Sequence, residues 1–330
     1  MPIPTARLPS APVDPAVDRP AGHHSTRSPA LLRRLALLTV LGSVVAFVVV
    51  WYVFIRTNDG RRFENFVWDS RRVMAPRVRS TQNDALNLVT EVTLGVGLLV
   101  ILLLGVVRRT WWVAVVTCAG IGGATVSTQV LKRIVINRPP TIGELARISA
   151  NSFPSGHATI CTAVALGALL MTGQRWRRLA MVLAAAWVAF QCTGVVTSGW
   201  HRPSDTLAGY AVALAWMAAA VWVLAATGQV TPERPRPLTT ARTRSLILGV
   251  AGVSAVGLLV GVSVGGDSAF SRGGVAYVLS ILVLTLCGLL TVWWFWELLD
   301  GWHVGGRTPL GGPETPSVPS SDGTGNDVHS

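Results

Sequence analysis

The sequence has few charged residues for its length. Charged side chains make up 13% of the 330 residues, whereas half of the residues are hydrophobic; an ordinary soluble domain has roughly 25% charged residues. Such a chain cannot cover a soluble globule with polar surface. Its apolar residues also fall in long runs, and a hydrocarbon core about 30 Å thick needs roughly 20 consecutive apolar residues per helix. The composition therefore excludes an ordinary soluble domain and predicts an all-α, polytopic transmembrane bundle.

Cysteine is also scarce, and its spacing carries no chemistry. The four cysteines lie inside apolar runs, without a Cys-x-x-Cys pair or the Cys/His spacing of a metal site: Cys118, Cys161, Cys192 and Cys287. Buried free cysteines behave as small hydrophobic residues. We therefore expect no disulfide framework, no zinc site and no cofactor held by cysteine.

Lysine is nearly absent, since Lys132 is the only lysine among 28 basic residues. The net charge of +12 would suit a nucleic-acid-binding protein. However, the basic residues lie at the ends of apolar runs and in short loops, where they orient membrane helices and contact anionic head groups. We therefore expect a bilayer and no nucleic acid as partner.

Eight apolar runs are candidate membrane spans. The first is too long for the hydrophobic part of a signal peptide, and Ile55-Arg56-Thr57 is not a small-residue cleavage pattern, so we expect this helix to be retained. The predicted transmembrane domain covers residues 35–298, between disordered tails at 1–34 and 299–330 that lack hydrophobic periodicity. The predicted spans are 35–55, 86–107, 110–131, 157–173, 179–197, 206–226, 246–264 and 275–295.

The arginines in short loops predict the orientation. They precede the first run and fill the connections after the second, fourth and sixth runs, which alternation places on one side of the membrane. That side should be cytoplasmic, together with both tails. The loop 57–84 opposes this assignment, because seven arginines from Arg56 to Arg79 would lie outside. We interpret this loop as an amphipathic segment at the membrane interface; the alternative is a lid that guides substrate.

Only two of the six histidines fall within the predicted membrane domain. His157 begins the fourth span and His201 precedes the sixth, so the chain crosses the membrane and returns between them. Both must lie on the same face, which the arginine pattern makes extracytoplasmic. Lys132 and Arg138 follow the third span and reach this face too. Ionisable residues near membrane depth usually line a functional cavity.

The residues on this face suit phosphoryl transfer. Lys132 and Arg138 supply positive charge, and a guanidinium binds phosphate oxygens in a two-pronged fork. Ser155 and Gly156 open a helix whose free N–H groups favour an anion, and glycine allows a ligand to approach the backbone closely. No cluster of carboxylates that would hold Mg²⁺ is present here, so the pattern implies no metal.

Two histidines and a carboxylate complete the set. Asp205 follows His201 by four residues and can bind one imidazole nitrogen, which leaves the other nitrogen as a nucleophile. His157 can then protonate the leaving oxygen. This arrangement predicts a reaction through a phosphohistidine.

These segments resemble the signature of the type 2 phosphatidic acid phosphatase (PAP2) superfamily of membrane lipid phosphatases. That signature is Lys-x6-Arg-Pro, then Pro-Ser-Gly-His, then Ser-Arg-x5-His-x3-Asp, and the resemblance covers residues 85–226 or so. It implies a six-helix catalytic core, with extra C-terminal helices at 246–298. By the resemblance, His201 is the nucleophile, Asp205 orients it and His157 is the general acid. Lys132, Arg138, Ser155 and Gly156 would hold the phosphate.

The sequence departs from this signature twice. Only five residues separate Lys132 from Arg138, so the lysine is out of register and Arg133 is an alternative. The arginine of the third motif falls at Val195. Arg202 or Arg147 is the candidate replacement as a phosphate ligand.

The sequence therefore predicts a metal-independent phosphatase of the cell membrane that acts on a lipid phosphate or diphosphate monoester. The candidate substrates are a polyprenyl diphosphate, phosphatidic acid and phosphatidylglycerol phosphate. The alternative is a lipid-binding or lipid-moving protein that kept the fold and lost turnover, which the missing arginine favours. A vanadate-dependent haloperoxidase of the same superfamily is disfavoured because those relatives are soluble. A transporter is disfavoured because no charged residue lies at mid-membrane depth.

Overall fold

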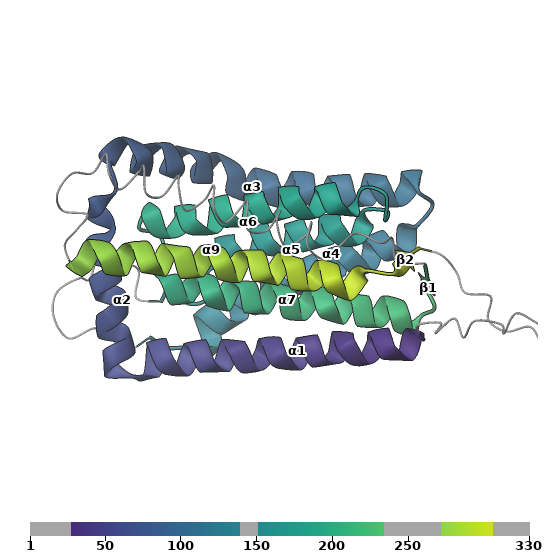
Figure 1. The fold of residues 1–330 in the computed structure, drawn as a ribbon, viewed down its shortest axis with the longest axis horizontal. Helices are drawn as coiled ribbons and strands as arrows, with labels where there is room; N and C mark the ends of the chain where they lie inside the picture. Colours follow the sequence, from purple (N-terminus) through teal and green to yellow (C-terminus); the bar gives the residue numbers. More distant parts are fainter. Residues whose placement is uncertain (1–27, 139–150, 234–271, 306–330) are drawn as a thin grey trace, which may run out of the picture.

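The computed structural model describes residues 28–138, 151–233 and 272–305. Long helices run side by side along the longest axis, one helix crosses them at one end, and a small two-stranded sheet lies at the other end (Figure 1). The elements in chain order are α1 (Pro29–Trp51), η1 (Tyr52–Arg56), α2 (Asn58–Ser70), η2 (Arg71–Val73), α3 (Pro76–Val107), α4 (Trp111–Val130), η3 (Leu131–Val135), α5 (Gly156–Met171), α6 (Arg177–Thr197), α7 (Pro203–Ala226), β1 (Val230–Pro232), α9 (Arg272–Leu299) and β2 (Trp302–Val304).

The all-α prediction is confirmed, but the count of eight spans is not. Five helical segments of the described chain are long and apolar enough to cross a membrane: Pro29–Arg56, Trp111–Val135, Arg177–Thr197, Pro203–Ala226 and Arg272–Leu299. Two further predicted spans correspond to shorter apolar helices, Leu94–Val107 and Gly156–Met171. The predicted span 246–264 lies outside the described residues.

Helix α1 starts before residue 35, where the membrane domain is predicted to begin. Helix α1 begins at Pro29, because the Ser28 hydroxyl accepts a hydrogen bond from the Leu31 N–H and proline suits the first helical position. Residues 29–34 therefore belong to the first span. The rest of that predicted tail, residues 1–27, lies outside the described residues.

The structure differs from the predicted disorder of residues 299–330 up to Gly305, because part of this segment forms a strand. Strand β2 pairs antiparallel with β1, with Thr231 opposite His303. The buried Arg177 side chain donates to the carbonyl oxygens of Leu299 at 2.8 Å and of Trp302 at 3.0 Å. These bonds satisfy carbonyls at the end of α9, so the chain beyond the helix stays packed against the bundle.

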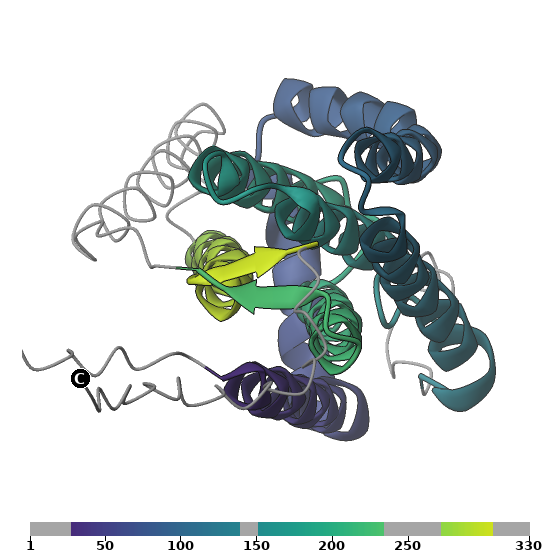
Figure 2. The same ribbon diagram turned by 90° about the vertical axis from the view of Figure 1, so that its right-hand side faces the viewer.

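Helix α7 is the centre of the bundle and packs against α1, α4, α5 and α9 (Figure 2). Gly209 allows α5 to approach it closely. A Cβ added at Gly209 would lie 2.9 Å from the Ala158 Cβ and 3.1 Å from the Ser155 carbonyl oxygen. The second turn of α7 is therefore in near-backbone contact with the start of α5, and both helices begin at the end of the bundle that α2 crosses.

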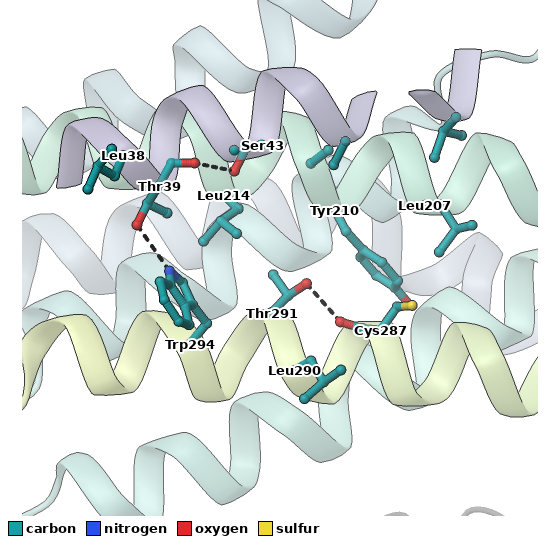
Figure 3. Close-up of a pocket in the computed structure, with 14 residues that line it drawn as sticks. Leu38, Thr39, Ser43, Leu207, Tyr210, Leu214, Cys287, Leu290, Thr291 and Trp294 are labelled. Atoms are coloured by element: carbon teal, nitrogen blue, oxygen red, sulfur yellow. Dashed lines mark hydrogen bonds between the residues drawn. The ribbon is translucent and has the colours of Figure 1, made fainter. Parts of the chain in front are cut away.

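An apolar groove of about 480 Å³ lies between α1, α7 and α9 (Figure 3). Trp294 Nε1 donates to Thr39 Oγ1 across it at 3.0 Å. Leu207, Tyr210 and Leu214 line it from α7. At about 100° per residue, these three positions point away from the side of α7 that carries Asp205. The groove and the histidine site therefore lie on opposite sides of α7.

Candidate active site

The two histidines of the membrane domain meet where α5 and α7 begin. Their ring centroids are 5.7 Å apart, with an angle of 59° between the ring planes. His201 is buried, and His157 also contacts Trp200. The structure thus brings together the two imidazoles that the sequence places 44 residues apart.

Asp205 orients the His201 ring. Its Oδ2 lies 3.3 Å from His201 Nδ1 and accepts the Arg202 N–H at 3.0 Å. The carboxylate is fully buried and lies in the first turn of α7, where the helix dipole favours negative charge. Because Nδ1 faces the carboxylate, Nε2 on the other side of the ring is the nitrogen that can act on a substrate.

Arg138 reaches the site from the segment after η3, as predicted, but both arms of its guanidinium contact carboxylates. Nη1 lies 3.2 Å from Asp205 Oδ1, and Nη2 lies 2.6 Å from Glu64 Oε2. Only 6% of the Arg138 side chain is exposed. In this conformation the arginine is therefore committed to protein carboxylates.

Glu64 is a site residue that the sequence analysis missed. It comes from α2, is fully buried, and accepts the Ser204 N–H at 2.9 Å through Oε1. Burial raises the pKa of Glu64, more than the neighbouring Arg138 charge lowers it. One signal was available: Glu64 is the only acid between Asp59 and Asp69 in a segment rich in arginine.

Helix α2 holds the loop that carries His201. Trp68 Nε1 donates to the Gly199 carbonyl oxygen at 3.1 Å, and Arg202 Nε donates to Asn65 Oδ1 at 3.1 Å. The segment 57–84 thus contains a helix that lies across the end of the bundle, next to the histidines (Figure 1). Its exposed aromatic side chains, Phe63 and Phe66, lie on the same helix as the buried Val67.

Ser155 and Gly156 open α5 beside the histidines. Ser155 is the N-cap residue: its hydroxyl accepts the Ala158 N–H at 3.2 Å, and its own N–H donates to the Asp205 carbonyl oxygen at 2.9 Å. A Cβ added at Gly156 would meet only Gln129 Nε2, at 3.5 Å. A methyl group would therefore fit next to the Gly156 backbone in ordinary van der Waals contact.

Lys132 is half-buried in η3, whereas Arg133, the alternative cation, is exposed. Lys132 lies within electrostatic range of Asp205 and His157. The Asn151 side-chain amide donates to the carbonyl oxygens of Lys132 and Ile136, which joins the end of η3 to the segment before α5. The geometry therefore favours Lys132 over Arg133 as the site cation.

The position of the missing arginine is apolar. Val195 is 1% exposed and packs in a hydrophobic cluster with Leu86 and Tyr277. Of the two candidate replacements, Arg147 lies outside the described residues. The Arg202 side chain is close to the site and largely buried, and this burial, together with the Arg138 charge, lowers its pKa.

Metal ligands do not gather at this site. Within residues 28–138, 151–233 and 272–305, no three histidine, cysteine or acidic side chains are grouped in a way that could hold a metal ion. The charged groups around the histidines are instead Arg138, Lys132, Asp205 and Glu64.

Apolar helices of membrane-spanning length, with two neighbouring histidines and a buried carboxylate at one end, define a membrane protein with a candidate active site. The family model of the PAP2 superfamily matches residues 109–229, so the chain carries a PAP2 region and the resemblance seen in the motifs is confirmed. Comparisons with curated proteins and with solved structures give no match. The matched region includes both histidines, Asp205, Lys132 and Arg138, whereas Glu64 and α2 precede it.

Proposed function

We propose that the protein is an integral membrane phosphatase that hydrolyses a phosphate or diphosphate monoester of a lipid through a phosphohistidine. The observation that carries this proposal is the pair of imidazoles with centroids 5.7 Å apart, one of which has Nδ1 against a buried carboxylate. One ring can thus act as the nucleophile while the other transfers a proton.

The reaction follows from these positions. Lys132, Arg138 and Arg202 supply positive charge, and the Gly156 N–H, beside the Ser155 N-cap, binds a phosphate oxygen at the start of α5. His201 Nε2 attacks phosphorus, the bond from phosphorus to the leaving oxygen breaks, and His157 donates a proton to that oxygen. Water then attacks the phosphohistidine, which breaks the P–N bond and releases inorganic phosphate. The charge on the transferring group is balanced by protein cations, so the proposed steps need no metal.

The apolar helices around the site support a lipid as the carrier of the phosphate, because a substrate anchored in the bilayer reaches the ends of these helices directly. The substrate class includes polyprenyl diphosphates, phosphatidic acid and phosphatidylglycerol phosphate. The arginine distribution supports a location in the cell membrane with the site at the extracytoplasmic face.

The test is phosphate release from these lipids by the purified full chain in detergent micelles with EDTA present. We expect activity in the wild type, and a loss of roughly 10²-fold or more in both His157→Ala and His201→Ala. His303→Ala is the matched control, since this half-exposed histidine lies in β2 at the opposite end of the bundle. Activity that EDTA abolishes, or that survives in both active-site variants, contradicts the mechanism.

The second candidate is a lipid-binding or lipid-moving protein without turnover. It is favoured by the apolar surroundings of Val195 and by the engagement of Arg138 with two carboxylates. It predicts lipid phosphate binding that does not change in His201→Ala, and no acid-labile phosphate on the protein after incubation with a labelled substrate.

A further inference from the structure

The Glu64 carboxylate lies between two hydrogen-bond donors from different parts of the chain. Oε2 is 2.6 Å from Arg138 Nη2, and Oε1 accepts the Ser204 N–H at 2.9 Å. Glu64 is fully buried, and the Arg138 side chain is 6% exposed. A carboxylate from α2 is thus held by a guanidinium and by the first turn of α7.

These two donors are of the kind that proteins use to bind phosphate. A guanidinium can bind the oxygens of a carboxylate or of a phosphate in the same way. Free N–H groups at the start of a helix likewise favour a carboxylate or a phosphate. A phosphate that used Arg138 Nη2 and the Ser204 N–H would have to replace both contacts of Glu64. The carboxylate and the phosphate therefore compete for one position.

We propose that Glu64 is a built-in competitor of the substrate phosphate, and that α2 must withdraw it before a phosphate can bind Arg138. This proposal rests on the phosphate site of the proposed function and adds the residue that sets its affinity. Glu64 lies outside residues 109–229, which the family model matches.

The charges around the site support this exchange. When Glu64 is withdrawn, basic side chains outnumber the remaining acids nearby, so an incoming anion is favoured. The basic side chains are Arg138, Arg202 and Lys132, and the remaining acids are Asp205 and Asp69.

Helix α2 lies at one end of the bundle, outside the packed core of α4, α5 and α7. The helix crosses the end of the bundle and is joined to its neighbours by the short segments η1 and η2 (Figure 1). Its polar contacts with the His201 loop are the Trp68 bond to Gly199 and the Arg202 bond to Asn65. A shift of α2 would break these contacts and the packing of the buried Val67 against Tyr277 and Ile281 of α9, whereas the packing of α5 against α7 does not involve α2. Lids of this kind close over many active sites.

The test is the binding of inorganic phosphate to the purified full chain, measured by calorimetry. The apparent affinity of a site is reduced by the fraction of molecules in which it is blocked. We therefore expect Glu64→Gln to bind phosphate roughly tenfold or more tightly than the wild type. Glu64→Asp, which keeps the charge but is one methylene shorter, should bind with intermediate affinity. Asp59→Asn is the matched control, because it removes one exposed carboxylate from the same helix.

Each outcome decides the proposal. Tighter binding in Glu64→Gln, with wild-type affinity in Asp59→Asn, supports it. Equal or weaker binding in Glu64→Gln overturns it and makes Glu64 a positioning residue for Arg138. If Glu64→Gln does not fold, the phosphate affinity of Glu64→Asp decides: tighter binding than in the wild type supports the proposal, and equal or weaker binding overturns it. Tighter phosphate binding without lipid hydrolysis by any variant would uphold this proposal and reject the phosphatase function.

Discussion

The His157 imidazole lies against the indole of Trp200, with the ring centroids 5.0 Å apart in a T-shaped arrangement. Trp200 is held in turn by a hydrogen bond from its Nε1 to Asn83 Oδ1 in α3, at 2.8 Å. The residue next to the proposed nucleophile therefore positions the proposed acid. A third helix, α3, takes part in the geometry of the histidine pair through this contact.

Trp200 substitutions should separate these two contacts. Trp200→Phe keeps an aromatic ring against His157 and loses the bond to Asn83, which should cost about 1 kcal/mol of stability with little loss of kcat. Trp200→Ala also removes the ring contact and should lower kcat roughly tenfold or more, since a misplaced acid transfers its proton poorly. Phosphate release and thermal unfolding, measured on both variants, check this; equal kcat in the two would contradict it.

Asp205→Asn should abolish most of the turnover. The amide cannot stabilise the imidazolium that forms at His201, and Arg138 loses one of its two carboxylate partners. We expect kcat to fall by roughly 10²–10⁴-fold while the protein remains folded. Steady-state kinetics on a short-chain lipid phosphate provide the measurement, with Asp59→Asn as the control; a fall of less than threefold would argue against the orienting role.

Restoring the arginine of the family signature should harm this protein. Val195 is buried in an apolar cluster, so Val195→Arg would place an unpaired charge there at a cost of several kcal/mol. We expect loss of the folded protein in size-exclusion chromatography, whereas Val195→Leu should fold. A folded Val195→Arg variant with higher activity would show instead that the site is only one substitution from the family pattern.

Gly209 substitutions should test the contact between α5 and α7. A leucine there would collide with Ala158 and the Ser155 backbone, which should destabilise the protein by about 1–3 kcal/mol and move the two histidines apart. Gly42→Leu is the matched control, because a Cβ at Gly42 meets nothing within 4 Å. The midpoint temperature of thermal unfolding and kcat should both fall in Gly209→Leu and stay unchanged in Gly42→Leu. Unchanged values in Gly209→Leu would contradict the account of how the helices bring the histidines together.

The membrane helices and the histidine pair could be predicted because each depends on local pattern and alternation. Apolar runs of sufficient length specify helices in a bilayer, and two spans between His157 and His201 return the chain to the same end. The short spacing of His201 and Asp205 predicts their contact, because Asp205 in the first turn of α7 can reach back to the residue that precedes the N-cap. In the structure His157 and His201 lie side by side, and Asp205 contacts His201.

Glu64 could not be predicted in the same way. Its contacts join α2 to Arg138 and to the start of α7, over separations of 74 and 140 residues. The segment 57–84 has no apolar run. Its pattern therefore predicts an amphipathic segment but does not predict that it packs across the end of the bundle. The same holds for the short sheet, because three-residue strands carry too weak a pattern to be recognised and form only where α9 brings Trp302 back to Pro232.

The sequence by itself determined the helices, the end of the bundle where the imidazoles gather and the partner of His201, because periodicity, span alternation and four-residue spacing act locally. Only the tertiary structure decided which anion Arg138 holds. That choice depends on α2 docking across the bundle and burying one carboxylate against a guanidinium from a distant segment, and no local pattern encodes such a contact.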